Sequence, residues 1–197
     1  KFLNAGQTCI APDYLVVEEK IKEQLLLALK KEIENAYPNN KEVQENYVQI
    51  VNDKNFSRLK QLILTDKIYH GGETNPENRS ISPTLLHNIN FEDAIMKDEI
   101  FGPILPIIFF ENLEDVIKKI KEREKPLSLY IYSKNKKRIK VSVCCSRISQ
   151  NWGQGYSVGR ARAEFTEHIR KTNRIREQCG KWQNPSPTLI SRQACSV

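Results

Sequence analysis

The chain has 197 residues, a length typical of one domain, and its side chains are 39% hydrophobic and 28% charged. It contains no run of about eighteen apolar residues, so we expect no transmembrane segment. Residues 1–142 carry 22 basic and 21 acidic side chains, so the net charge of +7 arises almost wholly from residues 143–197. This balance argues against a nucleic-acid partner for the main part of the chain.

The first notable stretch is Phe-Leu-Asn-Ala-Gly-Gln-Thr-Cys-Ile-Ala-Pro-Asp-Tyr at residues 2–14. It places Cys9 in a loop of small residues, where Ala5 and Gly6 allow backbone amides to approach a substrate oxygen. If residues 6–11 open a short helix, its amides also favour the thiolate, and Cys9 becomes a candidate nucleophile. The alternative is a structural cysteine that packs as a small buried hydrophobe.

Apolar residues at strand or helix spacing predict eight elements after this loop. They are strands at residues 13–18, 67–70, 81–86, 103–110 and 127–132, and helices at 19–37, 55–65 and 113–123. The inward face of the first helix is expected to carry six apolar side chains: Ile21, Leu25, Leu26, Leu27, Leu29 and Ile33. Continuous apolar strands that alternate with amphipathic helices predict an α/β fold with a largely parallel sheet covered on both faces.

The pattern changes near residue 140, so we expect a domain at residues 1–140 and a divergent basic tail at 141–197. The tail has one plausible helix, at residues 161–178, and otherwise reads as loop or disorder. Residues 1–142 contain 18 Lys and 4 Arg, whereas residues 143–197 contain 2 Lys and 7 Arg. We therefore hypothesise a shifted reading frame, an alternative exon or a misjoined gene model, which sequencing of the transcript across this boundary would test.

The remaining cysteines and histidines show no recognisable metal or disulfide spacing. Cys144, Cys145, Cys179 and Cys195 form no Cys-x-x-Cys pair, and the doublet at 144–145 is more simply a chance neighbour pair than a redox or lipidation site. The histidines are isolated, which favours ordinary loop or solvated residues: His70, His87 and His168. We therefore expect no metal site.

Two motifs resemble one enzyme family. Residues 2–14 are similar to the catalytic-cysteine segment of the NAD(P)-dependent aldehyde dehydrogenases, in which small residues lead to Gly-Gln-x-Cys, and the Ile-Ala-Pro-Asp-Tyr after it is similar to the class-three and fatty-aldehyde branch. Residues 97–104, Lys-Asp-Glu-Ile-Phe-Gly-Pro-Ile, resemble the family's Glu-x-Phe-Gly-Pro element. The motifs occur in the family's order, about ninety residues apart. The resemblance covers residues 1–140, since the Trp-Gly-Gln-Gly at 152–155 does not match the family's later glycine motifs.

The resemblance implies a function and three site residues. Cys9 would attack the aldehyde to form a thiohemiacetal, hydride would pass to NAD or NADP, and water would hydrolyse the thioester. Glu99 would hold hydroxyls of the nicotinamide ribose, and Phe101 would pack near the ring. Without the motif, Glu99 would be an ordinary solvated acid and Phe101 a core residue. Gly102 and Pro103 are expected to be geometric.

The resemblance also implies a fatty or aromatic aldehyde as substrate, a homodimer, and a cytoplasmic location or one on internal membranes for a complete enzyme. The family's oxyanion asparagine, general-base glutamate and nucleotide-binding glycines would precede the residues given, so we expect residues 1–197 alone to be inactive. The alternative is a non-catalytic remnant that acts as an interaction protein, with the basic tail binding an anionic partner. A third hypothesis is a structural partner of full-length subunits.

Overall fold

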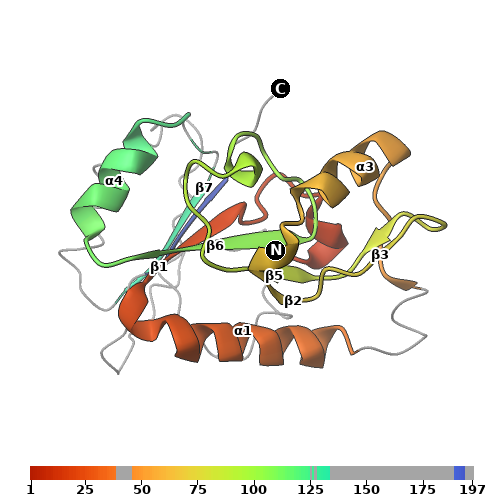
Figure 1. The fold of residues 1–197 in the computed structure, drawn as a ribbon, viewed down its shortest axis with the longest axis horizontal. Helices are drawn as coiled ribbons and strands as arrows, with labels where there is room; N and C mark the ends of the chain where they lie inside the picture. The colour runs from red at the N-terminus through yellow and green to blue at the C-terminus, as the bar shows by residue number, and fades with distance from the viewer. Residues whose placement is uncertain (39–45, 125, 127, 134–188, 194–197) are drawn as a thin grey trace, which may run out of the picture.

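Six strands form the main sheet in the order β2-β5-β6-β1-β8-β7 (Figure 1). This computed structural model describes residues 1–38, 46–124, 126 and 128–133, together with the backbone of 189–193. The strands are β1 (Tyr14–Glu18), β2 (Ile68–His70), β5 (Thr84–Leu86), β6 (Ile104–Phe110), β7 (Ser128–Tyr132) and β8 (Leu189–Gln193). A separate two-stranded sheet pairs β3 (Thr74–Asn75) with β4 (Ser80–Ile81).

The centre of the main sheet is parallel. β1 pairs with β6 through Leu15 opposite Ile107, and β5 pairs with β6 through Leu85 opposite Leu105. On either side the sheet continues with antiparallel pairs, β2 with β5 and β8 with both β1 and β7. The parallel centre and the helices around it confirm the predicted α/β class.

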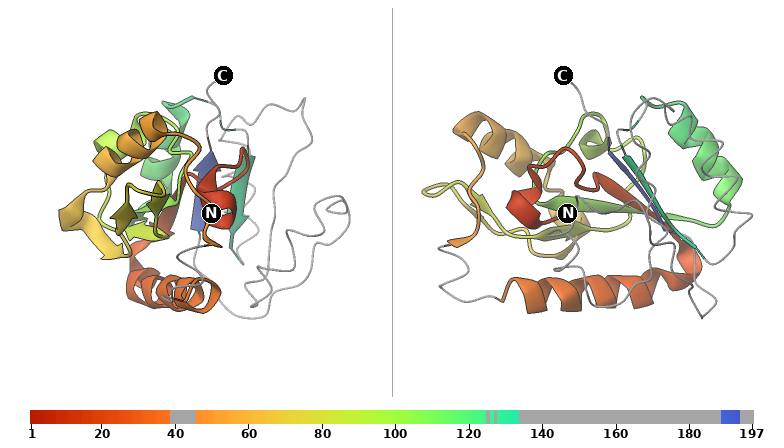
Figure 2. Two further views of the ribbon diagram at one scale, coloured as in Figure 1. Left: turned by 90° about the vertical axis from the view of Figure 1, so that its right-hand side faces the viewer. Right: turned by 180° about the vertical axis from the view of Figure 1, so that it is seen from behind.

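Helices cover both faces of the sheet: α1 (Lys22–Ala36) lies on one side, and α3 (Asp53–Leu62) and α4 (Leu113–Lys121) lie on the other (Figures 1 and 2). Alternate residues of β1 divide between these layers, because successive side chains of a strand point to opposite faces. Leu15 and Val17 pack in a cluster with Leu26 and Ile33 of α1. Tyr14 and Val16 pack in the other cluster, whose helical members are Phe56, Leu59, Val116 and Ile120.

The predicted helices are present with small shifts at their ends. A short 3-10 turn at Glu19–Ile21 precedes α1, and Asn52 starts α3 by accepting a hydrogen bond at its side chain from the Asn55 amide at 2.8 Å. Asn112 starts α4 in the same way, from the Glu114 amide. One prediction within α1 is wrong: Leu27 does not face inward but is 62% exposed, because the buried stripe of this helix follows Leu26 and Ile33.

The strand predicted at residues 81–86 is divided into β4 and β5, with Ser82 and Pro83 between them. Pro83 has no N–H to give to a ladder, and the Ser82 amide bonds instead to the Glu73 carbonyl at 3.0 Å. The chain then enters the main sheet at Thr84, whose amide donates to the Pro103 carbonyl at 2.9 Å.

β8 is a strand where the sequence predicted loop. It lies between β1 and β7, with Ile190 opposite Val16 on one side and Ile131 on the other. Its partner strands are more than fifty residues away in sequence. The pairing therefore depends on the edges of β1 and β7 and not on a local pattern of apolar residues. The predicted helix at 161–178 and the other tail residues lie outside the described residues.

Within the described residues, none of the helices has both the length and the apolar composition of a membrane-spanning segment. No group of three or more His, Cys, Asp or Glu side chains in the same part of the chain could hold a metal ion. His70 lies in β2, His87 packs edge-on against Tyr69 with 5.7 Å between ring centroids, and His168 lies outside the described residues.

Candidate active site

Cys9 lies in a loop at residues 3–11, here called the cysteine loop, directly before β1. Its thiol is exposed. The helix suggested at residues 6–11 is not formed: a single 3-10 turn at Leu3–Gly6 precedes Cys9, and the Ala11 amide closes a turn onto the Thr8 carbonyl at 2.9 Å. Asn4, Ala5 and Gly6 have φ of +52°, +52° and +72°, which an α-helix cannot continue. Within the described residues, no α-helix therefore begins at Cys9, and that part of the expectation was wrong.

Hydrogen bonds hold the loop on both sides of Cys9. The Gln7 side chain donates to the Gln49 carbonyl at 3.1 Å and accepts from the Val51 amide at 2.9 Å. After Cys9, the Tyr130 hydroxyl on β7 donates to the Ile10 carbonyl at 3.0 Å. Among the described residues, no group accepts a hydrogen bond from the Cys9 N–H. Cys9 thus lies in a loop that hydrogen bonds fix on both sides, and neither its sulfur nor its amide has a hydrogen-bond partner among the described residues.

The two sequence motifs meet at a pair of glycines. A Cβ on Gly6 would lie 2.2 Å from the Gly102 carbonyl oxygen and 3.2 Å from the Pro103 nitrogen, so only glycine fits there. This contact joins the cysteine loop to residues 98–103, here called the Glu99 loop, which precedes β6. Segments about ninety residues apart in sequence therefore share one end of the β1–β6 pair.

The Glu99 loop is held from two directions. The Ile100 amide donates to Asp13 Oδ1 at 3.0 Å, a buried hydrogen bond at the start of β1. From α3, the Arg58 guanidinium donates to the Glu99 carbonyl at 3.3 Å and to the Ile100 carbonyl at 2.7 Å. The Glu99 side chain is half-buried.

Phe101 is not a core residue, which was the alternative interpretation. Its side chain is 38% exposed, and its φ of +46° is a left-handed conformation that a bulky residue rarely adopts. Backbone strain of this kind persists where the surroundings fix it, and it concentrates at functional sites. An exposed aromatic ring in a strained loop beside the cysteine loop suits ligand contact better than packing.

Asp13 and Lys1 form a buried pair beneath both loops, with 4.0 Å between Lys1 Nζ and Asp13 Oδ1. Burial raises the pKa of Asp13, an effect that the charge of Lys1 and the Ile100 hydrogen bond oppose. Burial also lowers the pKa of Lys1 to about 8, against the opposing charges of Asp13 and Glu99. Desolvation therefore dominates at both groups, and the pair serves chiefly to place Ile100.

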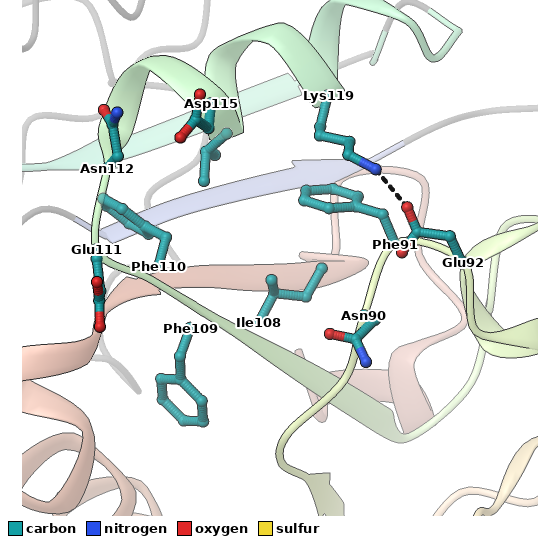
Figure 3. Close-up of a pocket in the computed structure, with 11 residues that line it drawn as sticks. Asn90, Phe91, Glu92, Ile108, Phe109, Phe110, Glu111, Asn112, Asp115 and Lys119 are labelled. Atoms are coloured by element: carbon teal, nitrogen blue, oxygen red, sulfur yellow. Dashed lines mark hydrogen bonds and ion pairs between the residues drawn. The ribbon is translucent and has the colours of Figure 1, made fainter.

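A hollow of about 370 Å³ lies elsewhere, at the carboxyl end of β6 (Figure 3). It lies beside α4 and is lined by Phe91, Ile108, Phe110 and polar side chains that include the Glu92–Lys119 ion pair. The hydrogen bond from Lys119 is the main cause that lowers the pKa of Glu92. None of Cys9, Glu99 and Phe101 lines this hollow, whose β6 residues are Ile108, Phe109 and Phe110, so we do not include it in the candidate site.

The structure thus brings Cys9, Glu99 and Phe101 to neighbouring loops, and it adds residues that the sequence analysis did not single out. Gln7 had a signal, since it belongs to the Gly-Gln-x-Cys motif. Asp13 likewise lies in the Ile-Ala-Pro-Asp-Tyr stretch. Arg58 and Tyr130 had no signal, because their partners are backbone carbonyls 41 or more residues away in sequence.

Comparisons with known proteins identify the family of this chain. A family model described as the aldehyde dehydrogenase family matches residues 1–166. The dimeric NADP-preferring aldehyde dehydrogenase of Rattus norvegicus is 42% identical over 140 residues, which are 71% of this chain and 31% of that protein. Aldehyde dehydrogenase family 3 member A2 of the same organism is 44% identical over 140 residues, 71% of this chain and 29% of that protein.

A solved structure shows the same fold. The substrate-bound AldH of Staphylococcus aureus superposes with a TM-score of 0.68 at 39% identity and covers 74% of this chain and 32% of that one. The chain therefore spans about a third of the length of the relatives it matches. With a family model over most of its length and both motifs in place, this chain belongs to the aldehyde dehydrogenase family, near its class-three members.

Proposed function

We propose that this chain carries the nucleophile-bearing part of an NAD(P)-dependent aldehyde dehydrogenase, which oxidises an aldehyde to a carboxylic acid through Cys9. The observation that carries the proposal is the contact of Gly6 with Gly102, which sets the cysteine loop against the Glu99 loop. Family membership supports the reaction class, and the exposed thiol supports the nucleophile.

In this proposal, Cys9 Sγ attacks the aldehyde carbon and the carbonyl oxygen becomes an oxyanion. The Cys9 N–H would donate to that oxyanion, since no described group competes for it. Loss of hydride from the thiohemiacetal carbon leaves a thioester on Cys9, and attack by water then releases the acid and restores the thiol. Gln7 and Tyr130 would keep the sulfur and the amide in one arrangement throughout.

The residues present fit the nicotinamide end of NAD or NADP, which when bound would supply the hydride acceptor. Glu99 offers a carboxylate that can accept from two neighbouring ribose hydroxyls, and Phe101 offers an exposed aromatic face. The Rattus norvegicus relative is named as NADP-preferring and dimeric, and we extend both properties, with NAD as the alternative cofactor, to the complete enzyme as proposals.

An apolar aldehyde, fatty or aromatic, suits the surroundings of Cys9. Five large apolar side chains on or beside the two loops are exposed: Leu3, Ile10, Val48, Val51 and Phe101. Val51 is tied to the cysteine loop through its bond with Gln7, and Phe101 adjoins the glycine contact. Exposed apolar side chains that gather in this way mark binding surfaces. For the complete enzyme we propose a cytoplasmic location or one on internal membranes.

A chimera tests the proposal. Residues 1–140 would replace the matching segment of the Rattus norvegicus dimeric NADP-preferring enzyme, and reduction of NADP would be followed with an aliphatic aldehyde. We expect turnover that Cys9→Ser abolishes, whereas residues 1–197 alone should reduce no cofactor. A folded chimera that binds NADP but shows no Cys9-dependent turnover would contradict the proposal.

A second candidate function rests on the excess of 9 basic over 3 acidic residues in the segment 143–197. We propose as the alternative that this tail binds an anionic partner. Binding of the chain to a nucleic-acid duplex should then weaken steeply with salt and vanish when residues 143–197 are deleted. Binding that survives the deletion would rule this alternative out.

A further inference from the structure

We propose that Arg58 is a positioning residue that seats the Glu99 loop against the cysteine loop, so that the two loops loosen together when its guanidinium is lost. The importance of this role rests on the proposed function, but the contacts that argue for it involve no ligand. They form a closed ring through four segments of the chain.

The first segment is α3, which carries Arg58. One guanidinium donates to two successive carbonyls of the Glu99 loop, those of Glu99 at 3.3 Å and Ile100 at 2.7 Å. A planar fork of donors is suited to such a double contact, whereas a lysine ammonium is a single compact point of charge. Arg58 therefore fixes the backbone from which the Glu99 and Phe101 side chains project.

The next residue of α3 holds the other end of the same loop. Leu59 is fully buried, and a Cβ on Gly102 would lie 2.4 Å from its Cδ2 atom. Between these two contacts Phe101 is kept at a φ of +46°. A strained, exposed residue between two contacts from one helix indicates that α3 imposes the conformation of the loop.

On its far side the Glu99 loop supports the cysteine loop. Gly102 contacts Gly6, and the Ile100 amide binds Asp13 at the start of β1, four residues after Cys9. A movement of the Ile100 backbone would therefore release both ends of the segment that contains Cys9.

The ring closes through the residues that lead into α3. Gln7 of the cysteine loop binds the Gln49 carbonyl and the Val51 amide, and Asn52 caps α3 directly afterwards. The Ile50 carbonyl and amide are held by Arg79, through its side-chain Nε and its own carbonyl. α3 thus contacts the cysteine loop by two routes, of which the one through Arg58 crosses the Glu99 loop.

Amide hydrogen exchange on the 197-residue chain tests the coupling. The reporters are the amides of Ile100, Gln7 and Ala11, which donate to Asp13, Asn4 and Thr8. In Arg58→Met we expect exchange at all three to accelerate by about tenfold, because a hydrogen bond to a charged group is lost at the loop. Lys60→Met, which removes the same charge from an exposed position of α3, should leave the three rates unchanged.

Arg58→Lys gives a further readout that simple loss of packing does not predict. Since lysine can contact one carbonyl but not bridge two, exchange should stay faster than in the wild type although the charge is kept. Acceleration at Ile100 without acceleration at Gln7 and Ala11 would overturn the proposal, as would no acceleration anywhere. Equal acceleration across β6 and the helices would also overturn it, since the effect would then be global.

The outcome is distinguishable from failure of the proposed function. Cys9→Ser removes the group that the proposed chemistry needs, but the Cys9 side chain supplies no bond of the ring, so this variant should not change the exchange rates. The coupling can therefore fail while the chemistry stands, and the chemistry can fail while the coupling stands.

Discussion

The two ends of the β1–β6 pair differ in how they are built. At the amino ends, two loops touch backbone to backbone at Gly6 and Gly102, and Cys9 of one motif and Phe101 of the other are exposed. At the carboxyl end of β6, an open hollow of about 370 Å³ is lined by mixed side chains and a surface ion pair. In this chain, close backbone approach and backbone strain mark the candidate site, whereas the open hollow does not.

The largest expected effect is at the glycine contact. Gly6→Ala places a Cβ against a backbone oxygen at a φ of +72°, and we expect it to lower the free energy of unfolding by about 4 kcal/mol. The matched control is Gly72→Ala, also at positive φ, where the new Cβ meets the mobile end of Ile68 and the loss should be about 1–2 kcal/mol. Urea unfolding measures both, and equal losses would contradict the account.

Asp13→Ala should follow, with a loss of about 3 kcal/mol, because it leaves the buried Ile100 amide and the Lys1 ammonium without their partner. The exposed Asp98→Ala should change the free energy of unfolding by less than about 0.5 kcal/mol. If the two variants unfold alike in urea, the Glu99 loop does not depend on Asp13.

The titration of Asp13 gives a pH dependence of known sign. Because burial raises its pKa above 3.8 in the folded chain, the folded state holds a proton that the unfolded state releases just above pH 3.8. The stability from this group is complete below pH 3.8 and is lost as the pH rises through the folded pKa. Relative to Asp13→Asn, the wild type should therefore lose stability as the pH rises from 3.8 through the raised pKa of Asp13. If the stability of the wild type relative to Asp13→Asn rose over that range, the inferred direction of the Asp13 pKa shift would be contradicted.

Tyr130→Phe should have a smaller effect, about 1 kcal/mol, since it removes one hydrogen bond to an exposed loop. The effect of this variant should be clearer in the rate at which a thiol reagent labels Cys9. Peptide-resolved mass spectrometry of maleimide labelling should show the Cys9 rate moving toward that of the denatured chain. Tyr132→Phe, two residues along the same strand, should leave the rate as in the wild type.

The smallest effect is expected at the hollow. Lys119→Met removes the ion pair with Glu92. Because both side chains are exposed to solvent, we expect the urea midpoint to stay unchanged. Labelling of Cys9 should not change either. If Lys119→Met changed the rate of Cys9 labelling, the two ends of β6 would not be independent as we propose.

The sequence predicted the elements whose pattern is local. β1, β6 and β7 follow short continuous apolar runs, α1, α3 and α4 follow apolar spacing of three to four residues, and the structure confirms each within a few residues. Leu27 was misplaced because it adjoins the buried stripe of α1 in sequence but not in space. β8 was missed because its hydrogen bonds come from strands far away along the chain.

For the candidate site, motif resemblance predicted Cys9, Glu99 and Phe101 as site residues, but it did not predict the contacts that hold their loops. Left-handed backbone at Asn4 and Ala5 replaces the expected helix, and although asparagine favours positive φ, the sequence gives no sign of it at Ala5. The role of Arg58 is invisible in the sequence because a long polar side chain on a helix usually faces solvent, and its partners here are carbonyls 41 and 42 residues away.

The most direct test of the central claim is the covalent state of Cys9 in the chimera described above. After mixing with NADP and an aliphatic aldehyde and rapid quenching in acid, mass spectrometry of the peptide that contains Cys9 should show an acyl group on its sulfur. The acyl group should be absent in Cys9→Ser. Turnover of the aldehyde with no acyl group on Cys9, or with one on another cysteine, would contradict the account.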